Sequence, residues 1–576
     1  MSGFVFVTVD PERATINMER PTLAFTKKGM LLTLEIRGSS YVLRLFANAS
    51  HDPAQVLSQR DGGRFCTYVG TLIYHSRTGK QATAAILQDV LQNGIQCIDS
   101  AIGNFCVMID DGRQLHVVTD RAGLHHVYRD RDLSLVTNSY ISAASAVTGK
   151  TFQTQEVLEY ILLGATFGSN TLLDEIKLHD SEQSIRVRNG VRESVSRGHN
   201  WTANVDCWRH LTLQERLCQA LDTADDYYGQ IARTYGERVT AALSGGYDSR
   251  LSLGLLLRHG VKPALFVYGP STNIDVRIAK AICRGEQLEL SHLDRGSRCS
   301  MEPDEYWNNQ EDVFHGLDGL TQYGFACEPF EVSHRRERVS GGQIAINGGG
   351  GEIWRDFWKV PDRAMSAHEF VRAYFSGRFS GLAASACARI QFLRNLATKI
   401  EEIVGEGNVS LTSPVVQSLY ARLRLRFWQG KNNSVDNHVG YAITPFSEER
   451  FSIPAMWIPL AAKRNGWFER QMIRRVSFSL ARYPSSHGYD FENGPSAFER
   501  AKEMVTRNLP ICMRAGRRRL SLRRSRFYFH SDRYVQARFG AGPLEVQKYV
   551  NLSQLGDTLA FSRALTIERM LRGEWV

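Results

Sequence analysis

This sequence of 576 residues lacks several features that would mark a membrane, secreted or repetitive protein. It has no run of about 18 apolar residues, which a helix needs to span a bilayer. Its first residues have no basic start and no small-residue cleavage site after an apolar core, so we expect no secretory signal. Internal repeats and low-complexity linkers are also missing. The sequence therefore predicts a protein of the cytoplasm with no membrane span.

The cysteines form no recognisable metal or redox motif. None of the ten belongs to a CxxC pair, and none has a histidine at zinc-ligand spacing. We expect reduced, mostly buried thiols, as is usual for cytosolic proteins.

Charge and composition are close to those of ordinary soluble proteins. The chain is 43% hydrophobic and 23% charged, which argues against disorder, collagen-like repeats and coiled coil. Lys and Arg number 70 against 60 Asp and Glu, a net charge of +10 that is mild for this length. At about 150 residues per domain, the length predicts two to four domains.

The first 195 residues or so are rich in predicted strands. Short β-branched, aromatic or alternating runs are separated by turn residues, and a helix is expected over 81–92. The strands are expected at 4–9, 30–36, 41–45, 103–109, 115–119 and 133–137. This pattern predicts an α+β domain built on a hairpin-dominated sheet.

The pattern changes from about residue 214. Apolar runs at 239–243, 264–267 and 344–346 alternate with helix-length segments, which predicts a doubly wound parallel sheet. After 367 the chain is predicted to be mostly helical. We therefore predict domains over 1–200 and 201–510, followed by a basic C-terminal extension over 511–576.

The strongest chemical motif follows the apolar run at 239–243. Two glycines allow close backbone approach, the start of the next helix offers N–H groups to an anion, and two serines add hydroxyl donors. A carboxylate in a phosphate loop would repel the ligand unless a cation lay between them, which indicates Mg²⁺. The residues predicted to form this site are Leu243, Ser244, Gly245, Gly246, Asp248 and Ser249.

The SGGYDS loop resembles the pyrophosphate-binding loop of the PP-loop ATP pyrophosphatases. The resemblance implies that ATP is cleaved between its α and β phosphates and that a substrate oxygen is adenylated. The run at 264–269 resembles the second strand of that family, which implies that Tyr268 and Gly269 contact adenine. Residues 275–282 resemble the helix that follows this strand.

A second glycine loop occurs at residues 347–352, with the sequence NGGGGE. It resembles the second phosphate and metal loop of asparagine synthetases, usually read G-E-G-[SA]-D-E. The resemblance implies that Gly350 and Gly351 approach the nucleotide and that Glu352 stands in for the metal-binding Asp. Ordering four consecutive glycines costs backbone entropy on folding, which indicates that the run has a specific purpose.

The N-terminal half supports the same family independently. The start MSGFVFV, the strand GNFCVMI at 103–109 and the segment TDRAGLHHVY at 119–128 resemble class II glutamine amidotransferase domains. Such domains have an Ntn-hydrolase-like sandwich. Both halves together identify the chain as similar to asparagine synthetases, with the resemblance running in patches to about residue 490.

Two departures from that family change the expected chemistry. The nucleophilic Cys of an active glutaminase is replaced by Ser2, whose hydroxyl is harder to activate, and the R-G-P-D substrate segment is not found. We therefore expect a degenerate, structural first domain. Arg470 lies where the family has a Lys, and as a permanent cation it would stabilise charge rather than act as a base.

The sequence thus predicts a ligase that uses ATP and Mg²⁺ to join a small-molecule or peptide carboxylate to an amine, with Asp248, Glu352 and Arg470 as catalytic residues and Asp248 and Glu352 as metal ligands. Related enzymes without a glutaminase include β-lactam synthetases and lasso-peptide macrolactam synthetases. A macrolactam synthetase would act on a precursor peptide encoded nearby. Amidation of a sugar acid is a further alternative within the class.

Two alternatives lie outside this class of ligases. A PP-loop tRNA-modifying enzyme would explain the positive charge, but such enzymes place the loop near the N-terminus or use adjacent cysteines. The other is a non-catalytic nucleotide-binding paralogue. The basic stretch at 514–526 is expected to be a solvated helix face or a subunit contact, and we expect no nucleic-acid partner.

Overall fold

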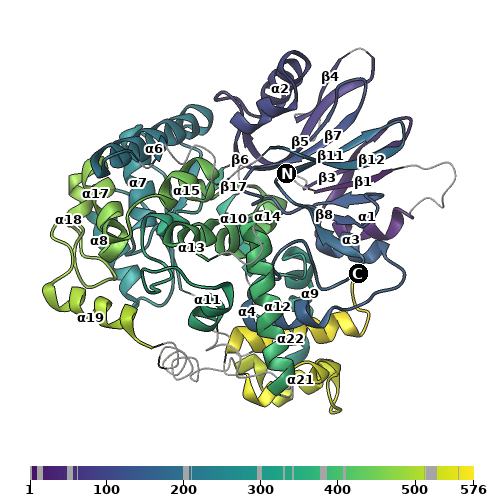
Figure 1. The fold of residues 1–576 in the computed structure, drawn as a ribbon. Coiled ribbons are helices and arrows are strands. Elements are labelled where there is room, and N and C mark those ends of the chain that lie inside the picture. The colour runs from purple at the N-terminus through teal and green to yellow at the C-terminus, as the bar shows by residue number, and fades with distance from the viewer. Residues whose placement is uncertain are drawn as a thin grey trace.

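The computed structural model describes residues 3–8, 17–48, 56–60, 62–198, 201, 207–208, 210–294, 301–328, 331–339, 343–375, 386–405, 410–510, 513, 528–555 and 557–576. Ser2 and the basic stretch at 514–526 lie outside these residues. In Figure 1 the strands of the N-terminal part lie at the upper right, and the helices of the later part fill the left side and the base.

The N-terminal part contains two antiparallel sheets of six strands each. The first runs in the order β10-β8-β9-β1-β3-β2, and the second in the order β12-β11-β7-β6-β5-β4. The strands of the first sheet are β1 (Gly3–Thr8), β2 (Leu31–Arg37), β3 (Tyr41–Ala47), β8 (Tyr128–Asp130), β9 (Leu135–Thr137) and β10 (Ile176–Leu178). Those of the second are β4 (Ser58–Arg60), β5 (Arg64–Ile73), β6 (Ile102–Asp110), β7 (Leu115–Thr119), β11 (Gln183–Arg188) and β12 (Val191–Ser196).

Alternation along the strands explains how the two sheets pack. In β1, Phe4 and Phe6 point into the core between the sheets, whereas Val5 and Val7 point to the outer face. Helices α1 (Glu19–Thr26) and α3 (Tyr140–Ala146) cover that outer face, and α2 (Gly79–Asn93) covers the outer face of the second sheet. Both faces of β1 are therefore buried. The layers confirm the predicted sandwich.

The second part is built on a parallel sheet of five strands in the order β15-β14-β13-β16-β17. The chain adds β14 and β15 on one side of β13, and then β16 and β17 on the other. The predicted doubly wound sheet is confirmed, and its order reverses between β13 and β16. The strands are β13 (Val239–Ala242), β14 (Ala264–Tyr268), β15 (Leu290–Leu293), β16 (Ile344–Ile346) and β17 (Tyr441–Ile443).

Helices surround this sheet and form most of the later chain, as predicted. Between the strands lie α6 (Leu213–Tyr235), α7 (Asp248–Arg258), α8 (Ile274–Glu286), α9 (Pro303–Gly316) and α10 (Glu331–Arg338). The others are α11 (Ala367–Tyr374), α12 (Ala386–Val404), α13 (Ser413–Leu419), the π-helix Tyr420–Gln429, α14 (Gly430–Val439), α15 (Glu449–Met456), α16 (Leu460–Lys463), α17 (Trp467–Val476), α18 (Phe478–Arg482), α19 (Ala497–Asn508), α21 (Asp532–Phe539) and α22 (Thr558–Leu571). Helix α4 (Thr154–Leu163) belongs to the N-terminal part, between β9 and β10.

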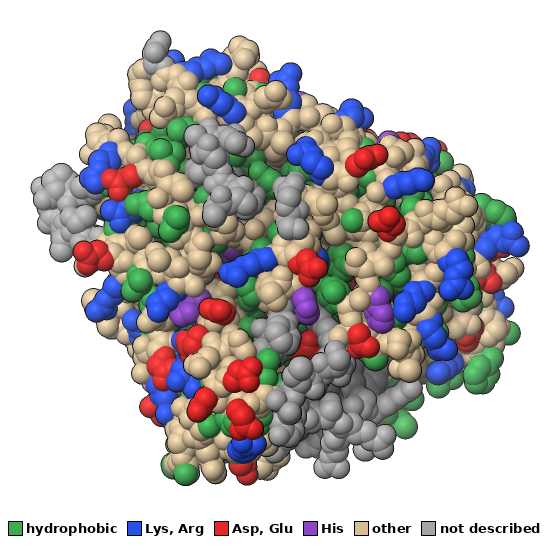
Figure 2. Space-filling view, turned by 180° about the vertical axis from the view of Figure 1, so that it is seen from behind, with side chains coloured by type: hydrophobic (Ala, Val, Ile, Leu, Met, Phe, Trp, Pro, Cys, Tyr) green, Lys and Arg blue, Asp and Glu red, His purple; other side chains and the backbone are tan. Residues whose placement is uncertain are grey.

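The end of the chain, predicted as an extension, folds back onto both parts. Arg563 of α22 donates to the carbonyl of Ile161 in α4 (2.9 Å), and Thr566 accepts from the N–H of Phe325 (3.0 Å). None of the described helices is long and apolar enough to cross a membrane. On the face seen in Figure 2, basic and acidic side chains of the described residues are interspersed.

Direct hydrogen bonds join the sandwich to the parallel sheet. Thr71 of β5 donates to Asn437 of α14 (2.7 Å) and accepts from the N–H of Ala442 in β17 (2.8 Å). The N–H of Gly103 in β6 donates to Glu448 (2.8 Å). The centre of the second antiparallel sheet thus rests on the edge of the parallel one.

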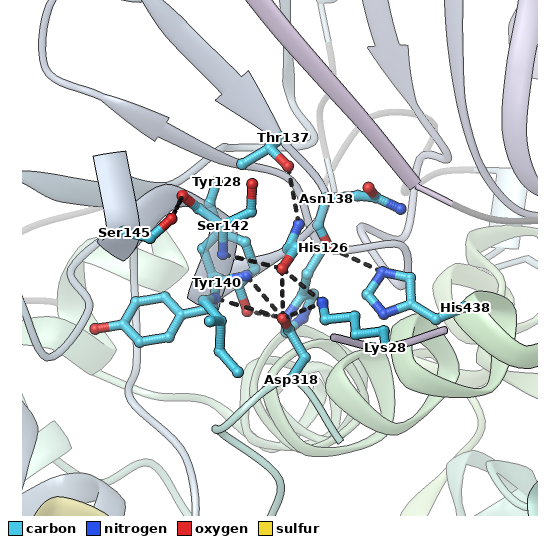
Figure 3. Close-up of polar contacts among 12 residues, drawn as sticks. Lys28, His126, Tyr128, Thr137, Asn138, Tyr140, Ser142, Ser145, Asp318 and His438 are labelled. Carbon is cyan, nitrogen blue, oxygen red and sulfur yellow. Dashed lines mark hydrogen bonds and ion pairs between the residues drawn. The ribbon is translucent and has the colours of Figure 1, made fainter. Parts of the chain in front are cut away.

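A buried charge cluster forms the second connection between the two parts (Figure 3). The carboxylate of Asp318, which follows α9, is fully buried. It accepts from Lys28 (2.5 Å), Lys431 of α14 (2.6 Å), Ser139 (2.6 Å) and the N–H of Tyr140 at the start of α3 (2.8 Å). One side chain therefore holds segments from both parts.

The electrostatics show how strongly this cluster is coupled. Burial lowers the pKa of Lys28 to about 8, against the opposing effect of Asp318. Burial would raise the pKa of Asp318, but the charges of Lys28 and Lys431 outweigh it and hold that pKa well below its ordinary value. Because the pKa of Asp318 is lower in the folded than in the unfolded chain, its stabilising contribution is complete above about pH 4 and declines as the pH falls further.

We predict that Asp318→Asn lowers the free energy of unfolding by about 3–5 kcal/mol, because two buried ammonium groups lose their counter-charge. Urea unfolding followed by circular dichroism measures this change. Glu369→Gln is a matched control, because Glu369 pairs with Arg363 near the surface, where solvent screens the pair. Equal unfolding midpoints for the Asp318→Asn and parent proteins would contradict the prediction.

Candidate functional site

The first glycine loop joins β13 to α7. The N–H of Leu243 bonds to the carbonyl of Phe266 in β14 (2.9 Å), which extends the sheet by one residue. The chain then turns, and α7 begins at Asp248. Within the turn, Ser249 accepts from the N–H of Ser244 (3.1 Å), and the two hydroxyls lie 3.0 Å apart. The predicted loop is therefore a tight strand–turn–helix unit held by its own serines.

Gly245 is wedged between the loop and its neighbours. Its N–H donates to the carboxylate of Asp275 in α8 (2.9 Å), and its carbonyl accepts from the N–H of Ser486 (3.0 Å). A Cβ at this position would lie 2.8 Å from the end of the Ile278 side chain, which would have to shift to make room for it. The N–H of Gly246 donates to Ser244 (3.2 Å). At the start of α7 the N–H groups of Arg250 and Leu251 bond to the carbonyl of Tyr247 (3.1 and 2.9 Å), so those of Asp248 and Ser249 precede the first helical hydrogen bond.

The second glycine loop follows β16 and packs directly on the first. A Cβ at Gly348 would lie 2.8 Å from the Cα of Ser249, so the two loops touch backbone to backbone. Gly350 has φ +101° and lies against Phe446 and Ser447, which follow β17. The glycines therefore let the loop fit between its two neighbours.

Both loops leave the sheet at the point where its strand order reverses. In open α/β sheets, the crevice outside the carboxyl ends of the strands at such a switch point is the usual ligand site. β13 and β16 are parallel neighbours, so the segments that follow them meet at the same edge. The two motifs, which are far apart in the sequence, therefore form one site.

A cluster of charges lies where the loops meet. The guanidinium of Arg355 lies 2.5 Å from Asp248, 3.6 Å from Glu352 and 2.8 Å from Glu469 of α17. A Cβ at Gly351 would lie 2.8 Å from Asp248 and 2.7 Å from Glu469, so glycine leaves room for these carboxylates. The structure thus brings Asp248 and Glu352 together, as expected, and adds a third carboxylate and a cation.

Burial dominates the electrostatics of this cluster. It raises the pKa of Asp248 to about 7, an effect that Arg355 opposes and Glu352 adds to. It also raises the pKa of the fully buried Glu469 well above its ordinary value, with a further contribution from Asp248. Glu352 is less buried, and Arg355 together with a hydrogen bond from Tyr420 (2.6 Å) lowers its pKa despite desolvation. Burial therefore favours the protonated forms of Asp248 and Glu469, and the charge of Arg355 opposes it.

An aromatic group forms one wall of the site. Tyr247 stacks on Phe491 with ring centroids 4.1 Å apart, and its hydroxyl lies 2.6 Å from that of Tyr489. The Arg355 guanidinium lies over the Tyr247 ring at 4.9 Å, within cation–π range. The Tyr247 ring therefore helps to hold the guanidinium in place beside the carboxylates.

The other predicted site residues lie further from the carboxylates. Tyr268 and Gly269 end β14, the neighbour of β13, where the N–H of Gly269 bonds to the carbonyl of Leu293 (3.1 Å). Arg470 of α17 packs against Gly494, and burial lowers its pKa. Its predecessor Glu469 is the residue of α17 that reaches the cluster.

Arg355, Glu469 and Tyr420 were missed by the sequence interpretation. Arg355 follows Glu352 by three residues, in and after a 3₁₀ turn (Gly351–Trp354), a spacing that places the two on one face. That spacing is a usable signal. Glu469 and Tyr420 come from distant helices, and nothing in their own neighbourhoods marks them.

A cavity of about 520 Å³ is lined by His487 and Tyr489, two residues whose side chains contact Tyr247. It lies between the segment that follows Arg355 and helix α19. His487 lies beside Tyr247, with ring centroids 4.8 Å apart. The lining includes Trp358, Lys359, His487, Tyr489, Glu499 and Lys502. Because the lining holds both cations and carboxylates among apolar side chains, it suits a polar ligand that carries both kinds of charge.

The predicted metal site fits only in part. Carboxylates at the ends of parallel strands are suitable ligands for Mg²⁺. However, Arg355 already pairs with Asp248 and Glu352, and the described part of the chain holds no group of three or more His, Cys, Asp or Glu side chains placed to hold a metal ion. In this arrangement the residues do not fit a protein-held Mg²⁺.

We predict that Gly348→Ala lowers the free energy of unfolding by about 1–3 kcal/mol, because the new methyl meets backbone that cannot move freely. Gly349→Ala is the control, since its nearest contact is the flexible Asn347 side chain at 3.2 Å, and we expect a change within about 0.5 kcal/mol. Thermal or urea unfolding compares the two. Equal effects would show that the two loops are not in contact.

Comparisons with known proteins add little to this geometry. The chain matches no protein-family profile and none of the curated proteins. It is similar to a glutamine phosphoribosylpyrophosphate amidotransferase from B. subtilis complexed with ADP and GMP, with 12% identity, a TM-score of 0.21, and coverage of 69% of this chain and 73% of that one. A structure described as the allosteric regulatory enzyme of purine biosynthesis gives 9% identity, a TM-score of 0.21 and coverage of 69% and 72%. Scores this low do not establish a shared overall fold, so the chain is assigned to no family. Its two-part architecture, α+β followed by α/β, is established by its own strand order.

Proposed function

We propose that the chain is an ATP-dependent carbon–nitrogen ligase. It would adenylate a carboxylate, release pyrophosphate, and transfer the acyl group to an amine with release of AMP. The observation that carries this proposal is the meeting of two glycine loops at the switch point between β13 and β16, with Asp248 and Glu352 side by side. The resemblance of both loops to those of asparagine synthetases supports the same reaction.

The proposed reaction is balanced as two displacements. A carboxylate oxygen of the substrate attacks the α-phosphorus of ATP, and the bond to the β-phosphate oxygen breaks, releasing pyrophosphate. The amine nitrogen then attacks the acyl carbon, AMP leaves with the bridging oxygen, and the amine gives up its proton. Positioning the reactants and stabilising the leaving pyrophosphate would supply most of the acceleration.

The protein's part in this scheme is to bind and orient. The N–H groups at the start of α7 and the hydroxyls of Ser244 and Ser249 would hold the pyrophosphate portion of ATP. Tyr268 and Gly269, at the end of the neighbouring strand, would contact adenine. Arg470 would add positive charge near the site without direct contact with the nucleotide. ATP normally arrives as its Mg²⁺ complex, whose metal would neutralise phosphate charge, but we derive no step through it.

The cavity lined by His487 and Tyr489 is the proposed place for the carboxylate and amine substrates. Lys359 and Lys502 would attract a carboxylate, and Glu499 would attract an ammonium group. A small molecule or the end of a peptide would be accommodated in about 520 Å³. The N-terminal sandwich is proposed to act as a structural domain without glutaminase activity.

We predict that Asp248→Asn abolishes the release of pyrophosphate from ATP in the presence of a panel of carboxylates and amines. The variant keeps the size of the side chain but removes the charge that orders Arg355. Pyrophosphate release is measured by a coupled assay, and mass spectrometry identifies the amide product.

Asp304→Asn is the matched control, because Asp304 is an exposed residue in the first turn of α9. It should leave the release rate unchanged. Undiminished release by Asp248→Asn would overturn the proposed mechanism. ATP binding without release in the parent protein, across the whole panel, would favour a nucleotide-binding protein without catalysis.

A second prediction concerns the sandwich. Glutamine alone should not be hydrolysed, because Ser2 lacks the readily ionised thiol of a glutaminase. Glutamate formation from glutamine is measured with the purified chain. Glutamate that appears with the parent and disappears with Ser2→Ala would show that the domain is an active glutaminase.

A further inference from the structure

The geometry points to Arg355 as the built-in cation of this site, in the place where the resemblance of the two loops implied Mg²⁺. On this view the protein itself binds no metal ion at Asp248 and Glu352, and the guanidinium neutralises charge when a polyphosphate binds. The metal part of this inference stands on its own. The polyphosphate part rests on the proposed function.

The first support is the position of the guanidinium among the carboxylates. It lies within 4 Å of Asp248, Glu352 and Glu469, which come from three different segments of the chain. A divalent cation bound by the same oxygens would have to occupy the same space. Two cations this close would also repel each other strongly in a site with little solvent.

The second support is that Arg355 is held in place from several directions. Its backbone N–H bonds to the carbonyl of Glu352 (3.0 Å), and its carbonyl accepts from the N–H of Phe357 (3.0 Å). The Tyr247 ring covers one face of the guanidinium. The side chain is largely buried. A residue fixed at both backbone and head group is a structural part of the site.

The third support is the lack of a side chain at Gly351. A side chain there would collide with Asp248 and Glu469, so the loop contributes no ligand of its own at this position. Glu352 is the one carboxylate that the second loop adds to the cluster, and Tyr420 donates a hydrogen bond to it. The second loop therefore supplies space for the carboxylate–guanidinium cluster.

Arginine suits this role chemically. Its planar guanidinium carries five N–H donors and keeps its charge at all physiological pH values. One edge can hold carboxylates while another binds phosphate oxygens. Unlike Mg²⁺, it needs no free ion from solution.

The test uses Mn²⁺ as the probe, with the full chain and no nucleotide. Mn²⁺ binding is followed by the loss of the free-ion signal in electron paramagnetic resonance. The parent should bind no Mn²⁺ at this site. Arg355→Met should gain a Mn²⁺ site, with an affinity at least about tenfold above any residual binding by the parent, because three carboxylates lose their cation. Adding Glu469→Gln to that variant should remove the site again.

Two further variants keep the test decisive. Arg363→Met, on the same segment but paired with Glu369 near the surface, should bind Mn²⁺ as the parent does. Arg355→Lys keeps the charge and should also exclude Mn²⁺, even if Arg355→Met does not fold. Tight Mn²⁺ binding by the parent that Asp248→Asn abolishes would overturn the inference.

Pyrophosphate binding in the presence of EDTA tests the second part. Isothermal titration of the parent should show binding without metal, and Arg355→Met should weaken it at least about tenfold and recover it with Mn²⁺. A parent that binds pyrophosphate only with Mg²⁺ would overturn this part. A parent that binds no pyrophosphate under either condition would overturn the proposed function, while the Mn²⁺ titration would still decide the role of Arg355.

Discussion

The carboxylate of Asp318 is the contact on which the arrangement of the two parts depends. It binds Lys28 and the start of α3 in the sandwich, and Lys431 of α14 in the second part. Helix α14 leads directly into β17, and the residues after β17 pack against Gly350. A side chain far from the site therefore helps to fix the position of its second loop, and it does so through charges that have no solvent to replace them.

The candidate site also contains a buried charge that needs opposite charges beside it, but with the signs exchanged. At Asp318 one carboxylate lies between two ammonium groups, whereas at Arg355 one guanidinium lies among three carboxylates. The first cluster is closed and solvent-free, which suits a permanent structural role. The second lies at the carboxyl edge of a parallel sheet, where Glu352 remains partly exposed. Only the second can exchange its contacts for those of a ligand.

The elements that were predictable from sequence carry their own signals. β1 and β13 are short β-branched runs, and the helix expected over 81–92 occurs as Gly79–Asn93. β5 was missed because both of its faces are buried, which removes alternation, and because Gly70 lies within it. In the site, Asp248 and Glu352 could be predicted from their loops. Glu469 could not, because adjacent residues on a helix point about 100° apart, and only packing decides that it rather than Arg470 faces the cluster.

The glycine run shows why such a motif predicts a site better than it predicts a ligand. Gly348 is needed where two backbones touch, Gly350 for its positive φ, and Gly351 to leave room for two carboxylates. Each requirement is met by contacts within the protein. In the first loop, Asp275 already accepts from the N–H of Gly245, as a phosphate oxygen would. A nucleotide bound by this N–H must therefore displace Asp275 as well as share Arg355 with Asp248, so affinity at this site depends on how easily these side chains give up their present partners.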